Sequence, residues 1–526
     1  MLPLLALPYL IPVLALAQED GLTSAERYKQ GHSRHGEAFD TGPRTRPVVL
    51  EDIGKVHFPI TTKNPEVQKW FDQGVTLLHS FWEYEAERAF RWCLKLEPDN
   101  AMAYWGLARA AGGERSRALI QEAVKRKNNV TERERLYIEA MEAMTIVDPL
   151  RDRSGEYQVR NREHNKKLES IVVKYPHDME ARAMLALGSM GDSRYAAEQI
   201  IREILGKQPD HPGAHHYRIH NWNYHEPEQA LASCRRYAEI ARGIGHAQHM
   251  PGHVYSTVGM WHEAAISMDA ATRIEIRRMG ERMVFPFNYW NYGHNRAYLS
   301  YIQEQLGMAE AALFGARQLV NVPLDPQANL DAGYSPHSQG IRSLVRAYVK
   351  FERWRDLLDR KSIPWRAIFA DRMLKAYAET RAHFGLADPY KAQKSLTAFA
   401  DLKKEIEKNK GFERTYNLMD KELKARLALA RGETLKGIGL LTESADMQYE
   451  MQSGDNDPPG YPEALFVSLG RVYLDSKSPT LAVQSFEKAL KLTRNDIFSL
   501  AGLVEAHHLL GERKKAEEYM ARLLYT

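Results

Sequence analysis

The sequence predicts an all-α solenoid of stacked helical hairpins, and three observations support this fold class. Residues 67–100 and 463–496 follow one 34-residue pattern of large and small side chains. Small residues recur at intervals of 33 and 34 residues, at Ala197, Ala230 and Ala264. The chain also lacks the period-two alternation of polar and apolar residues that is typical of strands. A solenoid explains how 526 residues are stabilised without one large core.

The N-terminal region differs in composition from the rest of the chain. Residues 2–17 are almost wholly apolar and end in Ala-Leu-Ala, which is typical of a signal peptide over 1–17. This run is short for a membrane span of about 20 residues. We therefore expect an exported protein, periplasmic or extracellular, without an integral membrane segment after cleavage. Residues 18–66 are rich in Gly and Pro and predict an extended arm.

The charge of the chain excludes one class of partner. It has 72 Lys and Arg residues against 68 Asp and Glu residues, which leaves a formal net charge of +4. No long basic block occurs, so nucleic acid is not an expected partner. Cys93 and Cys234 are its two cysteines, and both fall at packing positions of the repeat, which favours buried thiols over a disulfide.

The first copy of the 34-residue pattern shows why it predicts a hairpin. A small residue at Gly74 follows the large Trp70 by one helical turn and lets a second helix approach closely. Ala86 lies where the two helices cross, Phe90 fills the space between them, and Pro98 ends the second helix. These positions resemble the tetratricopeptide repeat (TPR) signature, which implies a right-handed α-solenoid.

The resemblance extends over most of the chain. The HGEAFDTGPR, VHFPITTKNPE, AMAYWG and HMPGH segments are similar to those of large secreted bacterial TPR proteins. It implies an N-terminal TPR array over 67–320, with His-rich repeats at 211–300, and a C-terminal TPR-like array over 321–526. TPR folds mostly bind partners, so it also implies a peptide, protein or small-molecule ligand in the concave groove.

Histidines are concentrated in residues 211–263, which contain nine of the chain's 20. His216 and His220 are four residues apart, and so are His249 and His253. Residues at i and i+4 lie on one face of a helix, about 5–6 Å apart at Cβ, so each pair can chelate one ion. Imidazole is a common ligand of zinc, copper and iron.

The repeat spacing places further histidines near the same groove. If the two pairs belong to neighbouring repeats, they can converge on one divalent transition metal (Zn, Cu or Fe), with His246 and His294 as added ligands. The interpretation we favour is an exported binding scaffold with a metal in its groove. A metal-dependent enzyme of hydrolase or oxygenase type is the alternative, and a metal-free peptide- or protein-binding module is the second alternative.

Two features of the sequence leave the geometry of this cluster open. The slot equivalent to His249 in the preceding repeat is His215 rather than His216, and one residue corresponds to about 100° around a helix. Pro251 separates His249 from His253, so His249 either precedes the helix or lies in its first turn. The remaining residues that we expect to line the groove are His215, His79, Tyr289, Trp290 and Tyr292.

Overall fold

The computed structural model describes the chain from residue 42 onward, with short gaps. The predicted signal peptide and most of the predicted arm lie outside the described residues, as does Tyr289. Of Trp290 only the backbone is described. The described residues are 42–43, 45–145, 153–283, 285–286, 290–323, 335–452 and 458–526.

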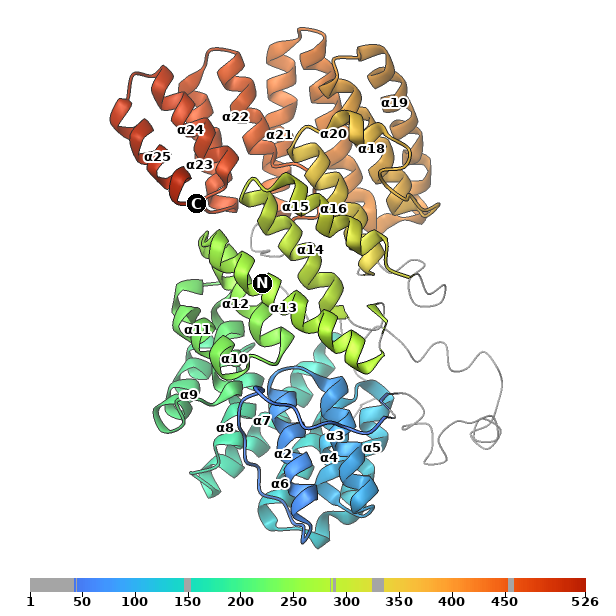
Figure 1. Ribbon diagram of the computed structural model, residues 1–526, viewed down its shortest axis with the longest axis vertical. Helices are drawn as coiled ribbons and strands as arrows, with labels where there is room; N and C mark the ends of the chain where they lie inside the picture. The colour runs from blue at the N-terminus through green and yellow to red at the C-terminus, as the bar shows by residue number, and fades with distance from the viewer. Residues whose placement is uncertain are drawn as a thin grey trace. The chain divides into compact units, whose positions relative to one another are not determined.

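Within these residues the fold is all-α, as the sequence predicts. There are 24 α-helices, α2 to α25, and no strand (Figure 1). Contacts between Cα atoms divide the chain into two compact units. Unit 1 comprises residues 1–222 and 229–250, and unit 2 comprises 223–228 and 251–526. The division falls inside α12 (Gly245–Val258).

Unit 1 contains five hairpins, each formed by an even-numbered helix and the odd-numbered helix that follows it. The helices are α2 (Pro65–His79), α3 (Glu83–Leu96), α4 (Ala101–Ala110), α5 (Gly113–Arg126), α6 (Glu132–Thr145), α7 (Arg153–Lys174), α8 (Met179–Ser189), α9 (Arg194–Lys207), α10 (Pro212–Trp222) and α11 (Leu231–Ile240).

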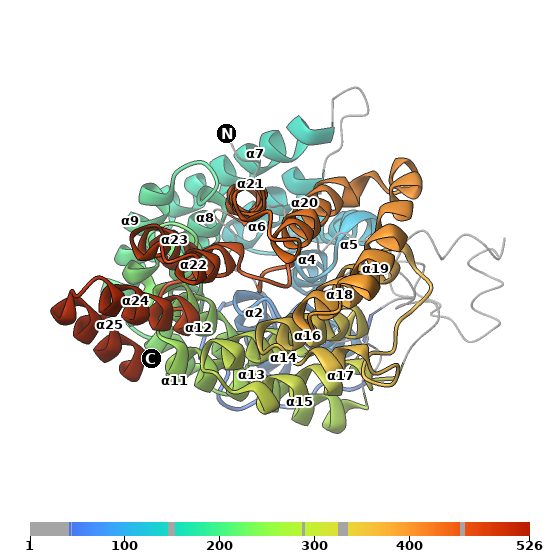
Figure 2. The ribbon, with the colours of Figure 1, turned by 90° about the horizontal axis from the view of Figure 1, so that it is seen from above.

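Unit 2 continues the same alternation of helices. The first helices of three successive hairpins, α14, α16 and α18, run side by side (Figures 1 and 2). Its helices after α12 are α13 (Trp261–Arg282), α14 (Trp290–Gln305), α15 (Ala309–Val320), α16 (Pro336–Lys350), α17 (Trp354–Leu358), α18 (Phe369–Gly385), α19 (Pro389–Asp401), α20 (Glu413–Ala430), α21 (Thr434–Gln452), α22 (Leu465–Asp475), α23 (Pro479–Leu492), α24 (Ile497–Leu509) and α25 (Arg513–Tyr525).

The packing of glycine against phenylalanine explains the repeat pattern. A Cβ atom added to Gly74 would lie 2.5 Å from the ring of Phe90, and one added to Gly106 would also lie 2.5 Å from that ring. Phe90 therefore packs against the first helix of its own hairpin and against that of the next. Phe486 makes the same contacts with Gly470 and Gly502 in unit 2. A side chain at any of these glycines would separate the helices.

Unit 1 contains one contact that a simple stack of neighbours would not have. The first helix of its last hairpin, α10, contacts α2, the first helix of its first hairpin. Gly213 makes this possible, because a Cβ atom there would lie 2.5 Å from the Nδ1 atom of His79. The two helices are separated by more than 100 residues in sequence. This return of the chain onto α2 builds the site described below.

The end of the N-terminal arm fills the face formed by α2, α4 and α6. Phe58 is fully buried, with its ring centroid 5.5 Å from Phe71, 5.6 Å from Trp105 and 4.8 Å from Tyr137. The backbone N–H of Thr61 donates to Glu134 at 2.5 Å. Part of the groove surface of unit 1 is thus covered by the chain itself.

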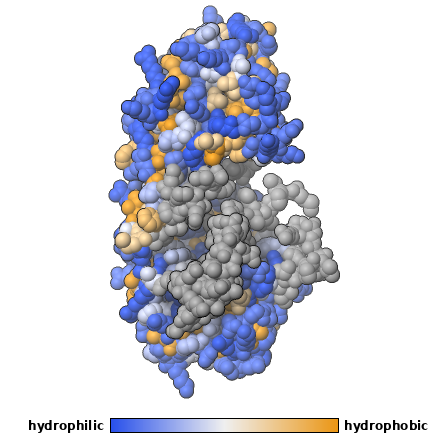
Figure 3. All heavy atoms as spheres, turned by 90° about the vertical axis from the view of Figure 1, so that its right-hand side faces the viewer, coloured by the Kyte–Doolittle hydropathy of each residue, from blue (hydrophilic) through white to orange (hydrophobic). Residues whose placement is uncertain are grey.

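Hydrophilic side chains cover most of the described surface on the face shown in Figure 3, with hydrophobic residues between them. No described helix combines the length and the apolar character that crossing a membrane requires. Cys93 and Cys234 are buried and unpaired, and burial raises the pKa of both thiols.

Candidate metal centre

Three histidines of unit 1 bring their Nε2 atoms together, and we call them the open cluster: His216, His220 and His246. The Nε2 atom of His216 lies 3.0 Å from that of His220 and 3.0 Å from that of His246. One ligand nitrogen from each ring lies within 4.8 Å of the others. Four tetrahedral ligands at the usual zinc–nitrogen distance of about 2.0–2.1 Å would be roughly 3.3 Å apart. The two separations from His216 are therefore close to what one ion requires, and all three nitrogens lie within 4.8 Å of one another.

The tautomer of His216 is set by a backbone contact. Its Nδ1 atom lies 2.6 Å from the carbonyl oxygen of His79. A carbonyl only accepts hydrogen bonds, so Nδ1 carries the proton and, in a neutral ring, Nε2 presents its lone pair. Metal-binding histidines are usually held in this way by a partner at the other ring nitrogen. His79 thus orients His216 through its main chain.

Burial keeps the rings of His216 and His220 neutral. It lowers the pKa of His216 well below its usual value, and His220 and His246 add to this effect. Burial also lowers the pKa of His220 to about 4. Neutral imidazole is the form that binds a metal ion, because a protonated ring has no free lone pair.

Aromatic rings enclose the open cluster. Tyr237 stacks on His216, with centroids 5.1 Å apart and planes inclined by 14°. Its hydroxyl donates to Ser80 at 2.9 Å, which holds the ring in place. The ring of Phe81 lies 4.5, 5.3 and 5.8 Å from His216, His220 and His246 respectively.

Phe81 adopts an unusual backbone conformation at this position. Its φ of 51° is in the left-handed region, which costs a bulky residue on the order of 1 kcal/mol or more. It lies in the turn between α2 and α3. Among the other described hairpins, this turn has a positive-φ glycine in four (Gly259, Gly307, Gly432 and Gly511) and a positive-φ non-glycine residue in three (Glu352, Ala387 and Lys477). The strained turn directs the Phe81 ring onto the histidines, whereas glycine would leave the cluster uncovered.

A second histidine cluster lies beside the first, and we call it the closed cluster: His79, Glu180 and His211. The carboxylate of Glu180 lies 2.5 Å from Nε2 of His79 and 3.2 Å from Nε2 of His211. The backbone N–H of Ala214 donates to Nδ1 of His211 at 3.1 Å, so the proton of that ring is on Nε2. The hydroxyl of Tyr217 lies 2.8 Å from Nδ1 of His79.

Every ring nitrogen of the closed cluster has a complementary partner. Both Nε2–H groups donate to Glu180, and both Nδ1 atoms accept. Burial alone would raise the pKa of Glu180, but His79 and His211 bring it below its usual range. Burial lowers the pKa of His79, so a neutral ring donates to a carboxylate anion. The closed cluster is satisfied without a metal ion.

The other unit 1 histidines of the predicted site, His215 and His249, lie outside the open cluster. His215 points away from the open cluster, with Nδ1 3.1 Å from the Ser233 hydroxyl and Nε2 2.8 Å from the Pro209 carbonyl. His249 lies within α12, which begins at Gly245 and includes Pro251, so it does not precede the helix. In unit 1 its ring stacks on His246 at 5.4 Å.

Two predicted ligands form a pair in unit 2. The Nε2 atoms of His253 and His294 are 3.3 Å apart, and their rings are stacked with centroids 5.4 Å apart. Tyr292 is buried in α14 near the contact of that helix with α15. Of the predicted groove residues, His79 lies in the closed cluster and His215 in the packing of α10 against α11.

The sequence did not indicate several residues that form the site. Phe81 lies far from the His-rich stretch and meets it only because α10 returns to α2. Glu180 lies on α8, in the hairpin before α10, and Tyr237 lies within the stretch, on α11. A bulky ring at a turn position where four other described hairpins have glycine was a weak signal for Phe81. No comparable signal was present for Glu180, which follows a capping Asp178 and looks like an ordinary first-turn carboxylate.

Comparison with known proteins identifies the repeat in one place. The tetratricopeptide repeat family profile matches residues 464–496. No match was found among curated proteins. Solved structures similar to the chain include the P58(IPK) TPR domain (14% identity, TM-score 0.23, covering 85% of this chain and 99% of that one). Yeast Tom70 (9%, 0.28, 86% and 90%) and a human IFIT1 dimer with m7Gppp-AAAA (11%, 0.28, 89% and 91%) are further examples.

Proposed function

We propose that this chain is a TPR-type binding scaffold whose unit 1 holds a divalent transition metal ion at His216, His220 and His246. One observation carries the proposal: three Nε2 atoms converge while the Nδ1 proton of His216 is committed to the His79 carbonyl. The lone pair of His216 Nε2 accepts one hydrogen bond well, yet it faces two nitrogens at 3.0 Å. A metal ion would use the lone pairs of all three rings together.

The chemistry of the ligands narrows the choice of ion. Three imidazoles in an aromatic surrounding favour zinc, copper or iron over magnesium and calcium, which prefer oxygen ligands. A peptide or protein partner is part of the proposal, since TPR scaffolds act by binding. The face of α2, α4 and α6 is covered by the arm, so we place the partner on another face.

Elemental analysis tests the proposal most simply. The full chain, purified without a histidine tag and dialysed against trace zinc, is expected to contain near-stoichiometric metal. His220→Ala is expected to lose it, because this ring supplies one of the three nitrogens and is the least buried of the three. His215→Ala is the matched control: its ring belongs to the same helix and is buried, but it faces Ser233 and Pro209. Equal metal content in both variants would refute the site.

A metal-dependent enzyme is the second candidate, and the number of ligands favours it. Three protein ligands leave a position for water, as in catalytic zinc sites, where the pKa of that water is about 7. His220 is only half-buried, so solvent reaches this side of the cluster. Hydrolysis of p-nitrophenyl acetate by the zinc-loaded chain, lost in His220→Ala, would support the enzyme. Equal hydrolysis rates for the zinc-loaded chain and His220→Ala would exclude the enzyme and leave only the binding scaffold as the proposed function.

A further inference from the structure

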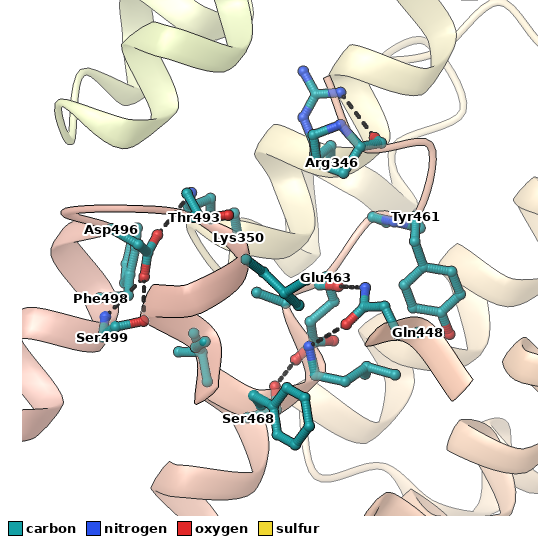
Figure 4. A pocket seen from close by; sticks show the side chains of 18 of the residues that line it. Arg346, Lys350, Gln448, Tyr461, Glu463, Ser468, Thr493, Asp496, Phe498 and Ser499 are labelled. Atoms are coloured by element: carbon teal, nitrogen blue, oxygen red, sulfur yellow. Dashed lines mark hydrogen bonds and ion pairs between the residues drawn. The ribbon is translucent and has the colours of Figure 1, made fainter. Parts of the chain in front are cut away.

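Unit 2 contains a cavity of about 650 Å³ that is separate from both histidine clusters. This is the size of a small-molecule site. Its walls include residues of α14, α16, α18, α20, α21 and α22 and of the segments that precede α22 and α24. Figure 4 shows Arg346, Lys350 and Phe498 among the side chains that line it. Tyr461 and Glu463 fix one of these segments: the Tyr461 hydroxyl donates to Glu422 at 2.5 Å, and Glu463 accepts from Arg426 at 2.7 Å.

Most basic residues around this cavity already have acidic partners. Arg381 donates to Glu463 at 3.0 Å and pairs with Glu422 at 3.0 Å. Arg426 pairs with the same two carboxylates. These guanidinium groups stabilise the wall of the cavity and have their charge neutralised within it.

Arg346 is different, because one edge of its guanidinium group is left over. Its side chain is only 6% exposed. Its Nε atom donates to both oxygens of Glu304, at 3.0 and 2.8 Å, and Nη1 lies 3.5 Å from the Pro459 carbonyl. Nη2 is buried and has no hydrogen-bond partner. A buried donor without a partner costs about 1–3 kcal/mol, so this edge is suited to an acceptor from a ligand.

Lys350 presents a second incompletely paired cation one helical turn away. Residues 346 and 350 lie on the same face of α16, and both line the cavity. The Lys350 ammonium is 3.6 Å from Asp496, which is longer than a hydrogen bond. Asp496 is already engaged at the start of α24, where it accepts from the Ser499 N–H and hydroxyl at 2.8 and 2.7 Å. Burial lowers the pKa of Lys350, so its pairing does not fully compensate its charge.

Aromatic rings lie beside these two cations. Arg346 lies over the Tyr301 ring at 5.2 Å, and Lys350 lies over the Phe498 ring at 5.1 Å. Gln305, next to Glu304 on α14, has a buried side-chain oxygen without a partner at the same wall. The cavity therefore combines two cations with spare donors, one spare acceptor and apolar ring surfaces.

We propose that this cavity binds a small organic carboxylate, with the anion on Arg346 and Lys350 and its apolar body against Tyr301 and Phe498. The carboxylate would accept from Nη2 of Arg346 and from the Lys350 ammonium, in charge-assisted hydrogen bonds. The site belongs to unit 2 and does not depend on metal binding in unit 1.

Calorimetric titration of the full chain tests this proposal with two ligands of matched size. 1-Naphthaleneacetate carries the carboxylate, and 1-naphthaleneacetamide has the same ring without the charge. We expect the carboxylate to bind at least about tenfold more tightly than the amide, a difference of about 1.4 kcal/mol. Lys350→Met is expected to remove this preference. Lys436→Met, which changes an exposed lysine of unit 2 outside the cavity, is expected to leave it unchanged.

Two further results decide the proposal. Arg346→Lys keeps a cation beside Glu304 but removes the guanidinium edge. It is expected to weaken the binding of naphthaleneacetate more than that of the amide. If circular dichroism shows that Lys350→Met is misfolded, Arg346→Lys replaces it as the test. Equal affinity for the two ligands in the wild-type chain, absence of binding by naphthaleneacetate, or unchanged preference in a folded variant would each overturn the proposal.

Discussion

The two histidine clusters of unit 1 come from different elements, the closed cluster from α2, α8 and the residue before α10 and the open cluster from α10 and α12. They also differ in where their protons are. In the closed cluster each ring nitrogen meets a complementary donor or acceptor, with Glu180 as the common acceptor. In the open cluster three nitrogens face one another without an acid between them. A count of histidines does not separate these cases, whereas the partner of each nitrogen does.

The largest expected difference between the clusters follows from removing the acid. Glu180→Ala leaves two imidazole N–H groups buried without acceptors and is expected to destabilise unit 1 by about 3 kcal/mol or more. His220→Ala in metal-free protein is expected to cost about 1 kcal/mol, because its ring is only partly buried and its loss leaves no buried charge unpaired. Urea denaturation followed by circular dichroism measures both. Similar costs for the two variants would remove the distinction between closed and open clusters.

The response to added zinc should be lost on mutation of the open cluster and kept on mutation of the closed cluster. Zinc at one hundred times its dissociation constant is expected to stabilise the chain by about 2.7 kcal/mol. His220→Ala is expected to abolish this gain, seen as a loss of the zinc-induced shift in thermal unfolding. Glu180→Gln, which keeps the size of the side chain in the closed cluster, is expected to retain it. If His220→Ala kept the shift and Glu180→Gln lost it, the ion would belong to the closed cluster, and the proposed site would be wrong.

The contact between α2 and α10 is the structural basis of both clusters, and Gly213 is its narrowest point. Gly213→Ala is expected to cost about 2 kcal/mol, since the added methyl group would force His79 aside. Because His79 orients His216, zinc affinity should fall as well. Gly206→Ala is the control, because a Cβ atom there meets no atom within 4 Å. A loss of stability in Gly213→Ala with unchanged zinc affinity would separate the helix contact from the metal site.

Phe81 should affect the kinetics of the open cluster more than its stability. Phe81→Gly relieves a positive φ but removes ring packing, so the net change in stability is expected to be below about 1 kcal/mol. Zinc transfer to a chelator, followed by absorbance, is expected to become faster because the histidines lose their cover. An unchanged transfer rate would show that Phe81 does not shield the site.

The hairpins were predictable because their determinants are local. Glycine and phenylalanine at fixed spacing, as in Gly74 and Phe90 or Gly470 and Phe486, specify how two adjacent helices approach. The same local logic predicted His216 and His220 on one helical face. It left the choice between His215 and His216 open, which depends on how α10 is rotated against α11 and α2.

The partners of the site could not be predicted because they depend on contacts far apart in sequence. His246 meets His216 through the packing of neighbouring repeats, which the repeat frame indicated. Glu180 meets His79 across about a hundred residues, through a closure of unit 1 that nearest-neighbour stacking does not imply. The cavity of unit 2 depends on a segment before α22 whose position no periodicity describes.

Zinc K-edge X-ray absorption of the tag-free, zinc-loaded chain tests the central claim most directly. The account predicts a first shell that includes three imidazole nitrogens at about 2.0 Å, and loss of this shell in His220→Ala. A chain that retains no zinc, or a spectrum that is the same in His220→Ala and in wild type, would contradict it.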